Sequence, residues 1–268
     1  MTAMMGAIDA VRANQWLGVA AVMGGGLVLL SAMRLWQYFT GPHPEVSRKA
    51  AHIAAHLTAL SFPWLFTDLW PVYLICGICI TGFVLFRFSR FCFNLLGAVI
   101  ESVQRDSFGG ILGIVGLGMV FTVFRHSPLI YSVPVLMAGL ADSAAALVGV
   151  NFGRHRYRIG KHTKSLEGSS AFFVVGFFCT AVPLAVWSPA GIIPAVLAGV
   201  ALAAFVGAVE ASAVGGLDNL LIPVFGCPGL AFLMGLPNDQ LGRVTVAATF
   251  FFMLLLAWHL SRGRKRGR

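Results

Sequence analysis

Long apolar stretches separated by short connections occupy most of this 268-residue chain, and they restrict its fold more than any other feature. A helix needs about 20 predominantly apolar residues to cross a bilayer. Candidate stretches lie at about 16–36, 48–66, 70–88, 109–124, 128–150, 167–187, 192–213, 218–235 and 244–260. Hydrophobic residues make up 58% of the chain and charged residues 11%, which excludes a water-soluble globule. We therefore expect an all-α, polytopic membrane bundle with these nine transmembrane segments.

The chain shows no long polar linker and no internal repeat, so residues 1–268 are expected to form a single membrane domain. Two of the nine stretches could be broken or re-entrant. The fourth is short, and the eighth contains Pro223 and Pro228. Such backbone is tolerated at membrane depth where protein or water covers it.

The distribution of Lys and Arg predicts the orientation. With nine crossings, all of these residues except Arg12, Arg125 and Arg243 fall on the face that carries the basic C-terminal tail, residues 261–268. Positively charged connections mark the cytoplasmic side, so the C-terminus is expected there. Residues 90–106 place apolar positions on one helical stripe and are expected to form an interfacial helix on that side. No removable signal peptide or organelle-targeting segment is evident, and a bacterial inner membrane is the expected location.

Asp142 is the acid that most needs explaining, because no other charge occurs between residues 128 and 150. An isolated carboxylate at the bilayer centre costs about 2.5–3.5 kcal/mol on insertion scales. Such a residue is therefore a candidate functional group.

The polar connection that follows Asp142, residues 151–165, carries five Lys or Arg, two His and no acid. Ser165 is expected to cap a helix whose first turn contains Glu167, so unpaired backbone donors would favour an anion such as phosphate. Anionic lipid headgroups could also explain the charge. Glycines at 149, 153, 160 and 168 would permit close approach of a ligand, which favours binding of an anion such as phosphate by the basic loop at 151–168 on the cytoplasmic face.

A second polar group lies on the stretch that begins near residue 45, where Glu45, Lys49, His52 and His56 share one helical face. The two histidines could bind a metal. The alternative is that they are polar interior residues hydrogen-bonded to neighbouring helices, because the sequence places no third ligand beside them.

Glu210, Asp218 and Asn219 form a third polar group, expected at the same membrane face as Asp142. Carboxylates beside phosphate-binding bases are typical of a Mg²⁺ site, because that ion is held by one or two carboxylates and substrate phosphates. Capping of the eighth helix by Asp218 is the alternative.

Several of these segments together resemble the CTP-dependent polyprenol kinase family, which includes phytol kinases, dolichol kinases and CTP-dependent diacylglycerol kinases. The resemblance covers most of residues 45–225. It is carried by Glu45-Val46-Ser47-Arg48-Lys49 with His52, by RDSFGG at 105–110, by ADSAAALVG at 141–149, by Phe152-Gly153-Arg154, by KSLEGS at 164–169, and by GLDNL at 216–220 before Pro223.

The resemblance implies transfer of the γ-phosphoryl group of CTP to a membrane lipid alcohol, with an isoprenoid alcohol of the phytol, farnesol or polyprenol type favoured over diacylglycerol. It implies Mg²⁺ as cofactor, with Asp142, Glu167 and Asp218 as ligands. Asp142 and His52 are the candidate catalytic bases. The nucleotide-binding residues that it implies are Arg48, Lys49, Gly153, Arg154, Lys161, Lys164, Ser165, Glu167 and Asn219.

Two other functions remain open. Phosphatidate cytidylyltransferases are distantly similar, although Gly-Leu-Asp-Asn at 216–219 stands where that group usually has an Asp-Arg-x-Asp arrangement. An ion-coupled transporter would also contain intramembrane acids, but it would place them near the midplane between related halves. The partners expected are CTP, the lipid substrate and membrane lipids, with no nucleic acid, and the oligomeric state is left open.

Overall fold

The computed structural model describes residues 9–88 and 108–265. These parts of the chain are mainly helical, in agreement with the predicted class. The elements are α2 (Gln15–Thr40), α3 (Pro44–Ala59), α4 (Phe62–Leu65), α5 (Trp70–Phe88), α8 (Gly109–Phe124), α9 (Pro128–Leu136), the π-helical turn η2 (Met137–Ala141), α10 (Asp142–Phe152), β1 (Arg156–Ile159), β2 (His162–Ser165), α11 (Leu166–Trp187), α12 (Ile192–Ser212), α13 (Asp218–Met234) and α14 (Asn238–Lys265). The predicted interfacial helix at 90–106 lies outside the described residues.

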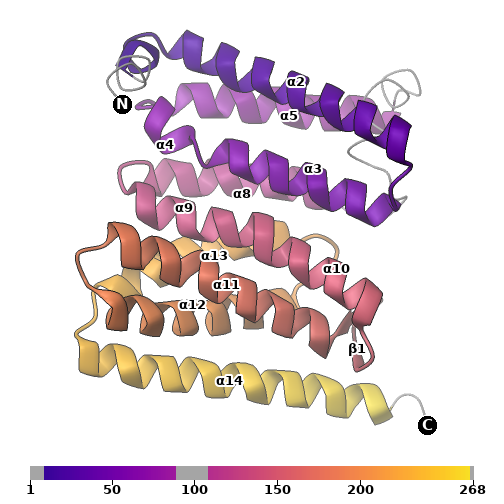
Figure 1. Ribbon diagram of the computed structural model, residues 1–268, viewed down its shortest axis with the longest axis vertical. Helices are drawn as coiled ribbons and strands as arrows, with labels where there is room; N and C mark the ends of the chain where they lie inside the picture. The colour runs from indigo at the N-terminus through magenta and orange to yellow at the C-terminus, as the bar shows by residue number, and fades with distance from the viewer. Residues whose placement is uncertain (1–8, 89–107, 266–268) are drawn as a thin grey trace.

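The long helices lie side by side with their axes nearly parallel (Figure 1). Helices α2 and α5 form one edge of the bundle, and α14 forms the other. Because successive helices run in opposite directions, the first residues of α3, α8, α11 and α13 lie at the end of the bundle that carries the β1–β2 hairpin. We call this the hairpin end. The C-terminal end of α14 lies there as well (Figure 1).

All nine predicted stretches coincide with helices, but they differ in their capacity to cross a membrane. Five helical segments of the described chain are long and apolar enough to do so: Gln15–Thr40, Pro128–Phe152, Leu166–Trp187, Ile192–Ser212 and Asn238–Arg262. The segments Trp70–Leu85, Gly109–Phe124 and Asp218–Met234 are apolar but shorter. At about 1.5 Å per residue, the 16 residues of α8 span only about 24 Å of a hydrocarbon core about 30 Å thick. The expected nine crossings are thus not confirmed. The chain is a membrane protein of at least several apolar helices.

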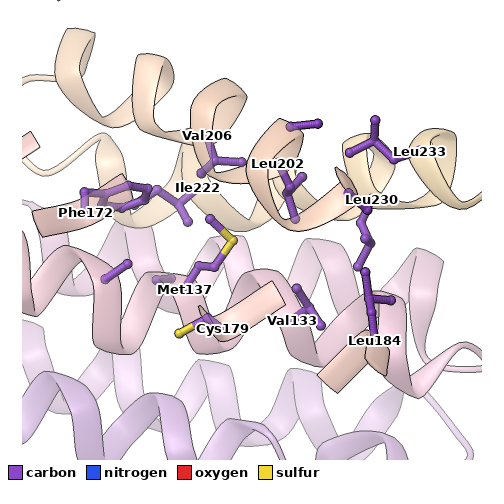
Figure 2. Close-up of a cluster of buried hydrophobic side chains, with 14 of the residues drawn as sticks. Val133, Met137, Phe172, Cys179, Leu184, Leu202, Val206, Ile222, Leu230 and Leu233 are labelled. Carbon is purple, nitrogen blue, oxygen red and sulfur yellow. The ribbon is translucent and has the colours of Figure 1, made fainter. Parts of the chain in front are cut away.

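The main hydrophobic core lies where α12 packs against α11 and α13 (Figure 2). Helix α12 is rich in Ala and Gly, and small residues allow helices in membranes to approach closely. Larger side chains from its neighbours, among them Met137, Phe172 and Leu230, fill the space between them. This packing holds the ends of α10, α12 and α13 in fixed positions relative to one another.

The basic connection after α10 is a two-stranded antiparallel hairpin, which the sequence analysis treated only as a loop. Its two-residue turn begins at Gly160, which has φ of 58°, a conformation that glycine adopts without steric cost. Tyr157 of β1 points inward and is 1% exposed, with Arg156 and Arg158 on either side exposed. Residue alternation along the strand therefore buries one aromatic ring and leaves the arginines in solvent.

Close packing explains three of the glycines that were expected to approach a ligand. A Cβ atom on Gly153 would lie 2.3 Å from the carbonyl oxygen of Gly149, and one on Gly168 would lie 2.8 Å from that of Ala145. At Gly149 a Cβ would lie 3.2 Å from Ser165 Oγ. The end of α10 thus packs directly against the start of α11, which fixes the hairpin between them.

Candidate functional site

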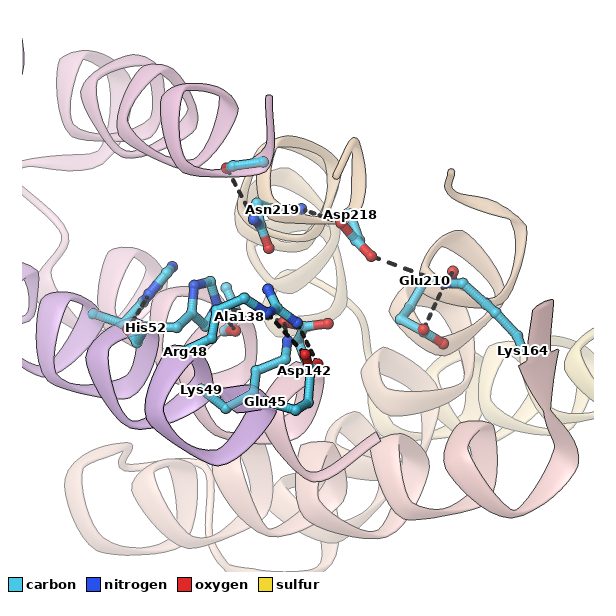
Figure 3. A network of polar contacts seen from close by, with 12 residues as sticks. Glu45, Arg48, Lys49, His52, Ala138, Asp142, Lys164, Glu210, Asp218 and Asn219 are labelled. Atoms are coloured by element: carbon cyan, nitrogen blue, oxygen red, sulfur yellow. Dashed lines mark hydrogen bonds and ion pairs between the residues drawn. The ribbon is translucent and has the colours of Figure 1, made fainter. Parts of the chain in front are cut away.

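Asp142 is the first residue of α10 and faces the inside of the bundle, where it is paired with Lys49 of α3 (Figure 3). Both side chains are buried. Pro134, which has no N–H group, interrupts the hydrogen-bond ladder before this position, and the helix continues through the π-helical turn η2. Such turns are frequent at functional sites, and this one directly precedes the aspartate.

His52 lies next to the Asp142 carboxylate. Its Nε2 is 2.9 Å from the carbonyl oxygen of Ala138 and 3.4 Å from Asp142 Oδ2. A bond to the carbonyl requires a hydrogen on Nε2, so Nδ1 is the basic atom of the neutral ring. His56 bonds through Nδ1 to the carbonyl of His52. His52 thus bonds to a neighbouring helical segment, as one of the two sequence interpretations expected, whereas His56 bonds within α3 and its Nε2 is buried with no hydrogen-bond partner among the described residues.

The hairpin contributes a second buried pair. Lys164 of β2 donates to Glu210 Oε1 of α12 at 2.6 Å and also to the carbonyl oxygen of Glu210. Its Nζ lies 3.9 Å from Asp218 Oδ2 at the start of α13. Gly215 and Gly216, with φ of 65° and 88°, reverse the chain between α12 and α13 and bring Asp218 beside Glu210.

Burial of Lys164 opposes its charge, but the carboxylates of Glu210 and Asp218 outweigh that effect and raise its pKa above 10.5. Lys164 is therefore cationic at physiological pH.

The three acids converge on one point. Asp142, Glu210 and Asp218 come from α10, α12 and α13, and each can present one oxygen within 4.8 Å of the others. Figure 3 shows them in one cluster with the lysines. Glu210 Oε2 is buried and has no hydrogen-bond partner within residues 9–88 and 108–265, which is costly unless a ligand satisfies it. Three carboxylates facing two ammonium groups leave an excess of negative charge, so the residues fit a divalent cation with oxygen ligands.

Helix N-termini add positive potential to the same region. Glu45, Gly109, Ser165 and Asp218 lie at the starts of α3, α8, α11 and α13, and all four line one cavity. Each N-terminus carries a partial positive charge and unpaired N–H groups, which favour anions. Ser165 caps α11 as predicted, accepting a hydrogen bond from the Gly168 N–H at 3.1 Å.

This cavity has a volume of about 1270 Å³, larger than the roughly 300–1,000 Å³ that is typical of a site for one small ligand. Its hairpin end is polar, and the remainder is lined by apolar residues of α2, α3, α5 and α8. The space is sufficient for a polar and an apolar ligand together.

Most of the residues predicted from sequence line the cavity. These are Arg48, Lys49, His52, Asp142, Lys161, Lys164, Ser165, Asp218 and Asn219. Arg48 is held by Glu45, with Nη2 2.5 Å from Oε1. Asn219 donates from Nδ2 to the carbonyl of Gly109 at 2.8 Å, which joins the starts of α13 and α8.

Gly153, Arg154 and Glu167 lie elsewhere, outside the set of residues that line this cavity. Glu167 accepts hydrogen bonds from the backbone N–H of His155 at 3.1 Å and pairs with its ring at 2.7 Å. It therefore closes the base of the hairpin, away from the three converging acids. The roles proposed for these three residues from the resemblance remain predictions.

The sequence analysis placed Glu210 in the polar group but gave it no role. It also did not anticipate that four helix N-termini meet. Glu210 ends an alanine-rich helix without any motif around it. The only available signal was an acid at the edge of an apolar stretch, eight positions before Asp218.

Two curated proteins are similar to this chain over most of its length. A protein named phytol kinase, from Synechocystis sp., is 31% identical over 212 residues, which are 78% of this chain and 88% of that protein. A protein named CTP-dependent diacylglycerol kinase 1, from Schizosaccharomyces pombe, is 30% identical over 225 residues, which are 76% of this chain and all of that protein. No protein-family model and no solved structure matches the chain. Identity and coverage at this level show that the chain belongs to the family of CTP-dependent polyprenol and lipid kinases.

Proposed function

We propose that this protein is a CTP-dependent lipid kinase that transfers the γ-phosphoryl group of CTP to the hydroxyl group of a membrane lipid alcohol. The observation that carries the proposal is one cavity with a charged end, whose acids and lysines suit a cation and phosphate groups, and an apolar remainder that suits a lipid. The name of one relative gives CTP as the donor, and the two names give phytol, an isoprenoid alcohol, and diacylglycerol as acceptors.

In the reaction, the hydroxyl oxygen of the lipid forms a bond to the γ-phosphorus, the bond between that phosphorus and the β–γ bridging oxygen breaks, and CDP leaves. Such a transfer depends mainly on positioning and charge neutralisation. Arg48, Lys49, Lys161 and Lys164 line the cavity and would hold phosphate oxygens. The four helix starts supply backbone donors beside them.

Asp142, Glu210 and Asp218 would hold Mg²⁺, with Glu210 in the place first predicted for Glu167. When bound, the ion would neutralise phosphate charge. The proton of the lipid hydroxyl passes to Asp142 or to His52, which lie 3.4 Å apart at the boundary between the polar and apolar parts of the cavity. A pH profile of kcat that loses its acid limb in His52→Asn would assign the base to the histidine.

For the membrane arrangement, we propose the nine-crossing topology, with the hairpin end and the C-terminus on the cytoplasmic side of a bacterial inner membrane. The basic residues of the hairpin, exposed at the end where the cavity is polar, support this orientation. CTP would then enter from the cytoplasm.

The direct test supplies purified protein with Mg²⁺ and with CTP labelled on either the α or the γ phosphate. The acceptors are phytol, farnesol, polyprenols, diacylglycerol and phosphatidic acid. Label from the γ position in a lipid phosphate is the expected result. Label from the α position in a product of phosphatidic acid would instead identify a cytidylyltransferase, and the absence of any labelled lipid would favour transport.

A further inference from the structure

The cavity extends well beyond the charged cluster as an apolar arm between α2, α3, α5 and α8, which lie together at one edge of the bundle (Figure 1). On α3 its lining residues follow one helical stripe from Lys49 through Ala55 and Ala59 to Phe62, at the start of α4. Alanines at 51, 54, 55 and 59 contribute small side chains to this lining, beside His52 and His56, and so leave room for a ligand.

The far end of the arm is closed. The lining residues there, Val22, Ala59, Phe62, Ile75 and Leu117, are each no more than 8% exposed and belong to one packed hydrophobic cluster. A chain that entered from the charged end would meet this cluster.

The length of the arm follows from the helix that lines it. From Lys49 to Ala59, the last residue of α3, the helix advances about 15 Å at about 1.5 Å per residue, and Phe62 lies just beyond its end. One leaflet of hydrocarbon is about 15 Å thick, half of a core of about 30 Å. The arm is therefore about as long as an ordinary lipid chain and much shorter than a dolichol.

We propose that this arm holds the hydrocarbon chain of the acceptor and that its closed end limits the length of that chain. This proposal rests on the proposed function. Alcohols with a chain about one leaflet long, such as phytol, place their hydroxyl group at the Asp142 cluster while the chain fills the arm. Polyprenols of dolichol length do not fit, so the polyprenol end of the expected substrate range is excluded.

Three consecutive glycines of α2 allow a controlled test of this limit. A Cβ atom on Gly24, Gly25 or Gly26 would meet nothing within 4 Å, so a side chain added at any of these positions starts in open space. Gly26 lines the arm, about 6 Å along the helix from Val22 at the closed end, whereas Gly24 and Gly25 do not line it. Gly26→Phe therefore fills the far part of the arm, and Gly25→Phe is its matched control.

The experiment measures kcat/KM for geraniol, farnesol, phytol and a dolichol-length polyprenol. The wild type is expected to prefer phytol to the long polyprenol by at least about tenfold. Gly26→Phe should lose at least about tenfold for phytol, because displacement of two methylene groups is sufficient for such a loss, and should retain activity with geraniol. Gly25→Phe should match the wild type with every alcohol.

Equal turnover of phytol and the long polyprenol, or equal losses in the two Phe variants, would overturn the length limit without touching the kinase assignment. If no alcohol is phosphorylated, the proposed kinase function is wrong. The proposal that the arm holds a lipid chain is then tested by the binding of phytol alone. Phytol should then still raise the thermal stability of the wild type and of Gly25→Phe but not of Gly26→Phe, and an equal effect on all three would reject the arm as a lipid site.

Discussion

At the scale of single residues, the Lys49–Asp142 pair is the feature on which most of the proposed chemistry depends. Both partners are buried, and the pair joins α3 to α10 across the polar end of the cavity. A buried pair of this kind is costly to form and contributes little net stability compared with apolar residues. The proposed role in binding or catalysis would account for such a pair at this position.

A double-mutant cycle separates structure from function at this pair. Lys49→Met or Asp142→Asn alone leaves one buried group without its partner, which is expected to cost about 3–5 kcal/mol when the remaining group is charged. The double variant should regain most of the lost thermal stability but no phosphoryl transfer, because Asp142 has lost its charge. Thermal denaturation and the transfer assay measure the two effects. A double variant that recovers both would show that the pair is only structural.

Sequence alone could predict the residues of this site that stand out against apolar surroundings. Asp142 was identifiable because hydrocarbon penalises a lone acid, and Lys49 and His52 because helical spacing places them on one face. Glu210 and Glu167 could not be distinguished in this way. Their roles depend on which direction each side chain faces, and this is set by the packing of α12 and by the hairpin.

At the scale of elements, the β1–β2 hairpin positions Lys164. Tyr157 pairs with Lys164 across the hairpin, donates or accepts a hydrogen bond with Ser169 Oγ at 2.7 Å, and stacks on His259 of α14 with ring centroids 5.2 Å apart. Burial raises the pKa of Tyr157 to about 12, so its hydroxyl remains protonated. The ring thus fixes the hairpin between α11 and α14.

Tyr157→Ala is therefore expected to weaken CTP binding through displacement of Lys164. It should raise the KM for CTP by about tenfold or more and lower stability by about 3–5 kcal/mol, as loss of a large buried ring does. Tyr157→Phe keeps the ring, loses about 1 kcal/mol with the hydrogen bond, and should retain a near-normal KM. Arg158→Ala, which truncates an exposed neighbour on the same strand, serves as control. An unchanged KM in Tyr157→Ala would contradict the positioning role.

The close packing of α10 against α11 gives a second prediction for the elements. Gly168→Ala places a Cβ 2.8 Å from a backbone oxygen and should lower the melting temperature clearly. Gly242→Ala in α14 meets nothing within 4 Å and should raise stability by about 0.5–1 kcal/mol, because Ala favours a helix more than Gly does. Equal behaviour of both variants in thermal denaturation would contradict the packing that fixes the hairpin.

At the scale of the whole molecule, sequence patterns predicted where the helices lie, but they did not establish which of these helices cross the membrane. Apolar stretches alone were sufficient to place nine helical segments. The stretch 109–124 was already recognisable as short, and it is α8. The stretch 48–66 was expected to be one crossing, whereas α3 ends at Ala59 and the short helix α4 follows it, a break that apolar composition does not reveal. The first residues of α3, α8 and α13 surround the polar end of the cavity. Sequence could therefore predict most residues of the site but not the shape of the cavity.

Cysteine labelling of intact cells tests the proposed topology. In a background without the native cysteines, Ala190→Cys lies in the turn between α11 and α12, at the opposite end of α11 from Arg158→Cys in the hairpin. A membrane-impermeant maleimide should label Ala190→Cys in intact cells and Arg158→Cys only after lysis. Labelling of Arg158→Cys in intact cells would place the hairpin outside.

The central claim is that acids from α10, α12 and α13 form one divalent-cation site, and the binding of Mn²⁺ in place of Mg²⁺ tests it most directly. Electron paramagnetic resonance on the purified full chain with CTP measures this binding without requiring turnover. Glu210→Gln and Asp218→Asn are each predicted to weaken it by about 10- to 100-fold or more, since even partners outside the ligand shell cost that much. Glu167→Gln should leave it unchanged. Binding that survives in the first two variants and disappears in Glu167→Gln would contradict the account.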